Sequence, residues 1–217
     1  MRVGAALIGS VAVAAGCGIA SADVPVGPGP NADYTVQPQP APGACHYRTA
    51  VDGSPLPDPL CTPGATNPDV TPDTLYSTIC RKGYSASIRP PREVTDVEKR
   101  SNAAAYAYQG PLADTEYDHL IPLALGGNPN DPRNLWVEPT ASPNPKDDIE
   151  FRLIQLVCRR QVSLADAQAA IASDWTTALA HLASRNYRTG SSATSISPAL
   201  AAARNWWKSS SDLSAYA

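Results

Sequence analysis

Two amphipathic helices are predicted in the C-terminal half of the chain, because apolar residues recur there at helical spacing. The first helix begins at Pro145. Its apolar stripe consists of Ile149, Leu153, Leu156 and Val157. The second begins at Ser163, where Ser163-x-x-Asp166 matches a capping box. Its apolar face consists of Leu164, Ala167, Ile171, Trp175, Leu179 and Leu182.

A strand, a loop, a second strand and the first of these helices are predicted between residues 114 and 160. The first strand is apolar around an adjacent Asp118-His119 pair, and a Gly-Gly turn follows it. The second strand begins at Asn134. Neighbouring residues of a strand point to opposite sides, so a bulge or loop is needed to aim both members of the pair at one substrate. Pro122 and the Gly-Gly turn supply this irregularity.

In the sequence before this unit, local signals predict two helices and a short strand. A Thr-Pro pair opens a helix over residues 71–79, because threonine is a good N-cap and proline fits the first helical position. Residues 85–88 are predicted as a strand. A longer helix over residues 96–108 follows, and Thr95-x-x-Glu98 is expected to be its capping box.

The first 22 residues have the pattern of a signal peptide: a short basic start, an apolar run and a final Ala-Ser-Ala. The mature chain is therefore expected to begin at Asp23, and the protein is expected to be secreted. Two alternatives stay open. The run can be a membrane anchor, although its many Ala and Gly residues make it weakly hydrophobic. Alternatively, Cys17 can be a lipidated terminus that anchors the exported protein.

The mature chain divides by composition into three parts. Residues 23–44 are rich in proline and glycine and are expected to form an extended tether. Residues 45–187 are expected to form one domain, which opens with an irregular lobe of turn formers over residues 45–72. Residues 188–217 are rich in Ser and Ala and are expected to be a tail.

Removal of the signal peptide leaves four cysteines, Cys45, Cys61, Cys80 and Cys158. An even number in an exported chain indicates two disulfides, and four cysteines allow three pairings. We favour Cys45–Cys61, which closes the proline-rich lobe, and Cys80–Cys158, which ties an early helix to the end of the central one. A zinc site is the weaker alternative, because no two cysteines have the close spacing of a zinc knuckle.

The net charge of −3 and a pI near 5.5 give the chain no overall basic character. This counts against strong sequence-independent affinity for nucleic acid, which requires many Lys and Arg contacts to phosphates. It does not exclude catalysis on nucleic acid, because a local phosphate-binding site is sufficient for chemistry.

The central unit resembles the HNH, or ββα-metal, nuclease family. Three segments carry the resemblance: Glu-Tyr-Asp-His-Leu-Ile-Pro-Leu-Ala-Leu-Gly-Gly from residue 116, Asn-Leu-Trp from residue 134, and Asn-Pro-Lys-Asp-Asp-Ile-Glu from residue 144. The flanks, over about residues 45–182, are similar to those of small secreted HNH-type proteins. The resemblance implies an α+β fold with a ββα-metal hairpin-and-helix core, flanking helices and a disulfide-stapled N-terminal lobe.

The same resemblance implies roles for four residues. Asp118 corresponds to a metal ligand, His119 to the general base, Asn134 to a brace of the loop, and Asn144 to a further ligand at the helix start. Hard oxygen ligands suit one Mg²⁺ or Mn²⁺ ion better than Zn²⁺. Asn144 has an alternative role, since Asn before Pro145 is also a good helix N-cap. The third position of the stricter family pattern is His, which this sequence lacks.

Three further residues near the helix start are candidates for the site. Lys146 and Arg152 are expected to bind substrate phosphate, with exposed surface charge as the alternative. Glu150 falls in a Lys-Asp-x-x-Glu segment that resembles one in secreted HNH-type proteins. The resemblance implies a hydrogen bond between Glu150 and a residue of the site.

The sequence thus predicts a secreted, metal-dependent endonuclease that hydrolyses phosphodiester bonds, of DNA more than of RNA. Binding to nucleic acid is expected to be weak and without strong sequence specificity. We expect a monomer with no membrane span, and an immunity protein as partner is left open. The alternative is an exported, non-catalytic binding protein that keeps the fold; the intact Asp118-His119 pair argues against it.

Overall fold

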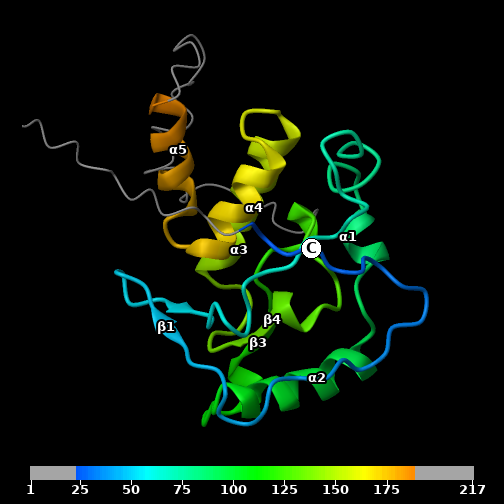
Figure 1. Cartoon of the computed structure of the whole chain (residues 1–217), viewed down its shortest axis with the longest axis vertical. Helices are drawn as coiled ribbons and strands as arrows, with labels where there is room; N and C mark the ends of the chain where they lie inside the picture. Colours follow the sequence, from blue (N-terminus) through cyan, green and yellow to red (C-terminus); the bar gives the residue numbers. More distant parts are fainter. Residues whose placement is uncertain (1–22, 189–217) are drawn as a thin grey trace, which may run out of the picture.

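A computed structural model describes residues 23–188 of the 217 and shows an α+β fold (Figure 1). The described part contains two small antiparallel strand pairs and five α-helices. No helix within residues 23–188 is long and apolar enough to cross a membrane. The predicted signal peptide, Cys17 and residues 189–217 of the predicted tail lie outside the described residues.

The central hairpin consists of β3 (Glu116–His119) and β4 (Leu135–Glu138), which pair antiparallel. In this register Asp118 lies opposite Trp136, and Glu116 lies opposite Glu138. The connection contains two 3₁₀ turns, η2 (Leu123–Leu125) and η3 (Pro132–Asn134). After β4 the chain enters α3 (Pro145–Cys158). The predicted order of strand, loop, strand and helix is therefore confirmed.

Helices cover the hairpin from both sides in Figure 1. Helix α2 (Arg92–Ala105) packs against β4, and Asn102 Oδ1 accepts a 2.8 Å hydrogen bond from Val137 N. On the other side lie α3, α4 (Leu164–Ser173) and α5 (Ala178–Arg188). The main core lies between these three helices and the loop after β3. Its largest fully buried side chains are Ile121, Leu125, Leu153, Val157 and Ile171.

The second C-terminal helix was predicted to continue to Leu182, and this is wrong. Helix α4 begins as expected, with Ser163 Oγ accepting from Asp166 N, but Asp174 is extended (φ −161°, ψ 102°) and ends it. The Asp174 carboxylate then accepts from the backbone N and the hydroxyl of Thr176. This aspartate bonds locally to the backbone, which competes with helix continuation.

Predictions for three segments of the N-terminal half, residues 71–79, 85–88 and 96–108, are also wrong. Residues 72–80 form consecutive turns instead of a helix, and residues 85–88 are not a strand, because Tyr84–Ser87 is the short helix α1. Helix α2 begins at Arg92, four residues earlier than expected. Glu98 does not cap it, since its carboxylate is buried and accepts from the backbone N of Gln37, far away in the sequence. A long-range contact therefore replaces the local capping box.

Residues 23–44 are extended, but they are bound along the domain. Gly27 N donates to Thr66 O and Thr66 N donates to Pro25 O, both at 2.8 Å. Tyr34 Oη donates to Ile88 O at 2.6 Å. The segment thus forms one wall of the domain instead of the tether that its composition predicts.

Both predicted disulfides are confirmed: Cys45–Cys61 and Cys80–Cys158. The first closes the N-terminal lobe, whose regular structure is one short hairpin of β1 (Arg48–Thr49) and β2 (Pro55–Leu56). The second joins the turn segment before α1 to the last residue of α3. Two disulfides are typical of a protein that folds in an oxidising compartment.

Removal of the Cys80–Cys158 bridge is expected to destabilise the domain more than removal of Cys45–Cys61. The two bridges span 78 and 16 residues, and a longer closed loop restricts the unfolded chain more. The loop-entropy relation gives about 4.5 and about 3 kcal/mol. Urea unfolding of the paired Cys→Ala variants measures both values; an equal or reversed order would show that strain or unfolded-state structure dominates.

Candidate functional site

His119 is the last residue of β3 and is buried, with 7% of its surface exposed. Its ring Nε2 lies 2.9 Å from the carbonyl oxygen of Pro129. A carbonyl oxygen can only accept, so Nε2 must carry the hydrogen of this bond. In the neutral ring, Nδ1 then has the free lone pair and is the atom that can accept a proton.

Burial lowers the pKa of His119 from its ordinary value to about 4. The hydrogen bond to Pro129 opposes this, while the positive charges of Arg89 and Lys146 add to the lowering. At neutral pH the imidazole is therefore uncharged. A neutral imidazole with a fixed tautomer is the form that a general base requires.

Asn134 holds the loop that carries Pro129. Its side chain is fully buried, and its Oδ1 accepts from Ile121 N at 3.0 Å and from Ala65 N at 3.3 Å. Its Nδ2 donates to Ile121 O and to Asn128 O, both at 3.0 Å. One amide thus closes the two ends of the loop onto each other, which is the position that a brace of this loop would occupy.

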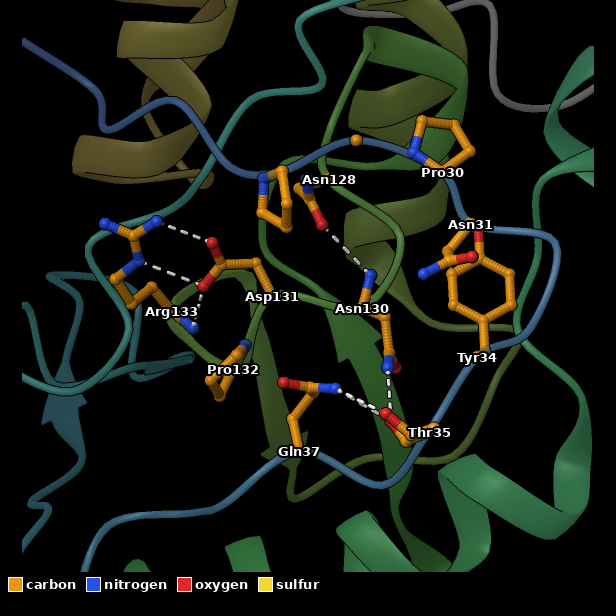
Figure 2. Close-up of a pocket in the computed structure, with 12 residues that line it drawn as sticks. Pro30, Asn31, Tyr34, Thr35, Gln37, Asn128, Asn130, Asp131, Pro132 and Arg133 are labelled. Atoms are coloured by element: carbon orange, nitrogen blue, oxygen red, sulfur yellow. Dashed lines mark hydrogen bonds and ion pairs between the residues drawn. The ribbon is translucent and has the colours of Figure 1, made fainter.

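A cleft of about 350 Å³ lies beside the same loop (Figure 2). Asn128 and Asn130, on either side of Pro129, form one wall, and residues 28–37 of the N-terminal segment form another. Asn130 Nδ2 donates across the cleft to Thr35 O at 2.9 Å. The N-terminal segment therefore helps to fix the loop to which His119 is bonded.

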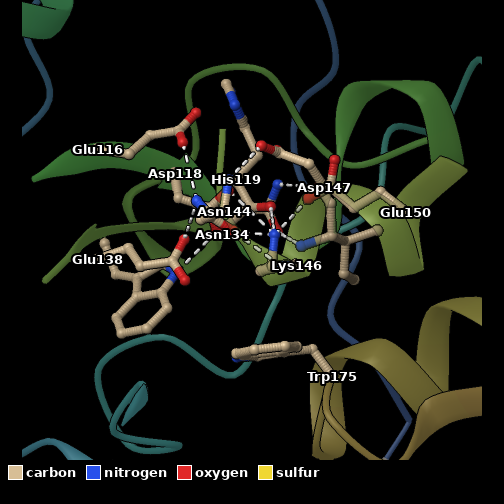
Figure 3. Close-up of polar contacts among 12 residues, drawn as sticks. Glu116, Asp118, His119, Asn134, Glu138, Asn144, Lys146, Asp147, Glu150 and Trp175 are labelled. Atoms are coloured by element: carbon tan, nitrogen blue, oxygen red, sulfur yellow. Dashed lines mark hydrogen bonds and ion pairs between the residues drawn. The ribbon is translucent and has the colours of Figure 1, made fainter. Parts of the chain in front are cut away.

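Asp118 points to the other face of β3 and bonds to the start of α3 (Figure 3). The ammonium of Lys146 lies 3.0 Å from Asp118 Oδ1 and 2.8 Å from Oδ2, and it also donates to His119 O at 3.0 Å. Its third partner is Glu150, one helical turn further along α3. Trp136 Nε1 donates to Asp118 Oδ2 at 2.8 Å. The Asp118 carboxylate is thus bonded through both oxygens.

Asn144 is the N-cap of α3. Its Oδ1 accepts from Lys146 N at 2.9 Å, and Asp147 Oδ2 accepts from Asn144 N at 2.9 Å, which completes a capping box. Its Nδ2 points to Glu116 Oε2 at 3.3 Å and to Glu138 Oε2 at 3.4 Å. The cap that the sequence allowed is therefore present, and it engages the side-chain oxygen that was expected to bind a metal ion.

Asp118 and Lys146 form an acidic cluster with Glu116, Glu138 and Glu150 (Figure 3). All three glutamates have raised pKa values. Burial, with the negative charge of Asp118 next, raises the pKa of Glu116 to about 7 and that of Glu138 to about 8. Burial likewise raises the pKa of Glu150 to about 7, although the ammonium of Lys146 opposes it. The cluster thus contains more carboxyl groups than its one lysine can neutralise.

The stability of the domain is expected to fall as the pH rises from about 6.5 to 8.5, by on the order of 1–2 kcal/mol. A carboxyl with a raised pKa is protonated in the folded chain at a pH where it is ionised in the unfolded chain, so the folded state binds more protons. His119 acts in the opposite direction, but only between about pH 4 and 6.5.

Thermal melting at a series of pH values measures this trend, and Glu138→Gln is the control, since an amide cannot release a proton. The variant should lose less stability over the same range than the wild type. Identical slopes for the two proteins would show that Glu138 does not titrate in this range.

The expected metal site does not match the arrangement of its two ligands. Both oxygens of Asp118 are bonded to Lys146 and Trp136, and the oxygen of Asn144 is bonded in the helix cap. Within residues 23–188, no group of three or more His, Cys, Asp or Glu side chains is arranged to hold a metal ion. Because their oxygens are already bonded, Asp118 and Asn144 do not fit a pair of ligands for one divalent ion.

The structure brings together most of the predicted site residues, but it buries Lys146, which was expected to bind phosphate. Lys146 has only 1% of its side chain exposed, so its ammonium is not on the surface where a phosphate would bind. Arg152 is partly exposed and lies two residues beyond Glu150. Two residues rotate an α-helix by about 200°, so the Cα of Arg152 lies on a different side of α3 from that of Glu150. Its role in binding phosphate stays a prediction.

Sequence reasoning missed four residues of the site. Glu116 could have been found from strand alternation, because it lies two residues before Asp118 and therefore shares its face of the strand. Glu138 and Trp136 share that face from β4, but the cross-strand register is needed to place them. Arg89 is exposed and lowers the pKa of both His119 and Glu116, so its charge acts at the site. Nothing in its sequence neighbourhood indicates this.

Comparison of the chain with protein-family models, with curated proteins and with solved structures found no match. The geometry of the site is therefore the basis for the functional proposal.

Proposed function

We propose that this chain is an exported HNH-type endonuclease that hydrolyses phosphodiester bonds of nucleic acid, DNA in preference to RNA, with His119 as the general base. One observation carries the proposal: the hydrogen bond from His119 Nε2 to Pro129 O, which leaves Nδ1 as the proton acceptor of a neutral ring. The order of hairpin and helix around it supports the same proposal.

In the proposed reaction, Nδ1 of His119 takes a proton from a water molecule, and the water oxygen forms a bond to phosphorus. The bond from phosphorus to the leaving oxygen breaks, and that oxygen takes a proton from solvent. Arg89 is the exposed cation whose charge reaches His119, so we propose it as the group that binds the phosphate. A single such cation fits the weak affinity expected of a chain with net charge −3.

Incubation of the purified mature chain with supercoiled plasmid and with RNA tests the proposal. Each substrate is tested with Mg²⁺, with Mn²⁺ and with EDTA. We expect nicked and linear plasmid in at least one condition, and faster cleavage of DNA than of RNA. His181→Asn, a change at an exposed histidine of α5, should cleave like the wild type. Intact nucleic acid in every condition would favour the alternative of a non-catalytic binding protein.

A further inference from the structure

We propose that the ammonium of Lys146 takes the place of a divalent cation at Asp118, so that this site has a built-in positive charge and does not bind Mg²⁺ or Mn²⁺ there. This inference rests on the proposed function, because it identifies Lys146 as the cation of the proposed hydrolytic site. It departs from the metal site that the sequence predicts.

The oxygen atoms around Lys146 Nζ are the kind that surround a hard metal ion. They come from the carboxylates of Asp118 and Glu150 and from the carbonyl of His119. An ammonium group has three N–H donors, and each of these residues accepts one. The three oxygens converge on the nitrogen from β3 and from α3, so the ammonium joins the hairpin to the helix as a bound ion would.

Lys146 stays charged in this position. Burial alone would lower the pKa of a lysine, but the carboxylates of Asp118, Glu150 and Glu138 together raise it above the ordinary value. The side chain is 1% exposed, so solvent screens these interactions little. A buried lysine is therefore the permanent counter-ion of this acidic cluster.

A divalent ion at Asp118 would have to displace this ammonium. Asp118 Oδ1 accepts from Lys146 and Oδ2 accepts from Trp136 Nε1, and the ammonium lies within 3.0 Å of both oxygens. An additional ion beside the ammonium would meet a like charge at close range in a buried site, where repulsion is strong. Lysine and metal ion therefore exclude each other here.

The structure makes Lys146 a positioning residue. All three of its donors are used within the protein, so it has none left for a phosphate. Its effect on the reaction passes through Asp118 and through the carbonyl of His119, whose ring is the proposed base. It fixes the end of β3 against α3 and keeps the adjacent histidine in place.

Titration of the mature chain with Mn²⁺, followed by electron paramagnetic resonance of the free ion, tests the proposal without any need for cleavage. The wild type should bind no Mn²⁺ through Asp118, so Asp118→Asn should leave its titration unchanged. Lys146→Met removes the charge and frees the oxygens, and it should bind one Mn²⁺ at least 10-fold more tightly than the wild type. Adding Asp118→Asn to this variant should abolish the gain.

Two further variants serve as controls. Lys99→Met makes the same change at a lysine that donates to two backbone carbonyls, Leu112 O and Thr115 O, and it should bind no Mn²⁺. Lys146→Arg keeps the charge and should behave like the wild type. If Lys146→Met fails to fold, the Mn²⁺ titrations of the wild type and of Asp118→Asn are sufficient to test the proposal. Mn²⁺ binding by the wild type that is lost in Asp118→Asn would overturn the proposal.

The cleavage assay separates this inference from the proposed function. Cleavage that persists in EDTA supports both the proposed nuclease function and the inference that Lys146 replaces the metal ion. Cleavage that requires a divalent ion, together with Asp118-dependent Mn²⁺ binding by the wild type, refutes the inference and leaves the nuclease assignment standing. Absence of cleavage in every condition, together with the expected Mn²⁺ titrations, refutes the nuclease and leaves Lys146 as the cation of the cluster.

Discussion

His119→Ala is expected to lower the turnover number for plasmid cleavage by about 100-fold or more, because loss of a general base removes the group that takes the proton from water. The Michaelis constant should change little, since the proposed phosphate contact is made by Arg89. Single-turnover cleavage at saturating and subsaturating enzyme separates the two quantities.

The substitution also removes a buried ring, so the fold of the variant needs a separate check. Far-ultraviolet circular dichroism and melting should show a folded domain at the assay temperature. His119→Asn, which keeps a polar side chain in the same place, should be as slow as the alanine variant. A folded His119→Ala protein that cleaves at the wild-type rate would trace the activity to another site or to a contaminant.

Asn134→Asp is expected to destabilise the domain by about 3 kcal/mol or more, because it replaces two buried donors by a carboxylate oxygen. That oxygen would face the carbonyls of Ile121 and Asn128, which now accept from Nδ2. Cleavage should fall as well, since Asn128 precedes the proline that holds His119. Urea unfolding measures the stability, and the assay above measures the activity.

Asn31→Asp is the matched control for this change. Asn31 is exposed, and its side chain accepts a hydrogen bond through the oxygen that aspartate keeps. We expect its effect on stability to be within about 0.5 kcal/mol. An Asn134→Asp protein as stable as this control would show that the amide does not brace the loop.

The hairpin and the helix of the central unit could be predicted because their signals are local. Asn144 and Pro145 mark the start of α3 by capping chemistry, and the four turns that follow keep an apolar stripe. The disulfide pairing was predicted correctly for a related reason. A bond between Cys45 and Cys61 closes a short lobe, so the other two cysteines are left to join distant elements.

The other parts of the fold and of the site could not be predicted, because they depend on contacts between residues far apart in the sequence. Glu98 matches a capping box locally, but in the fold its carboxylate accepts from Gln37 N, 61 residues away. Lys146 looks like surface charge until β3 is placed against α3 and Asp118 lies within reach of its ammonium. Propensity and spacing do not contain this information, because tertiary packing decides which face of an element is buried.

Nitrogen-15 NMR of the His119 ring over a pH titration tests whether this histidine is a neutral base with a fixed tautomer, because it reports the protonation state of both ring nitrogens without a substrate. We expect a neutral ring with hydrogen on Nε2 and none on Nδ1 at pH 7, and a pKa of about 4. The chemical shifts of the two ring nitrogens distinguish the tautomers. Hydrogen on Nδ1 at pH 7, or a pKa near the ordinary value of about 6.5, would show that His119 is not held as a neutral base through Nε2.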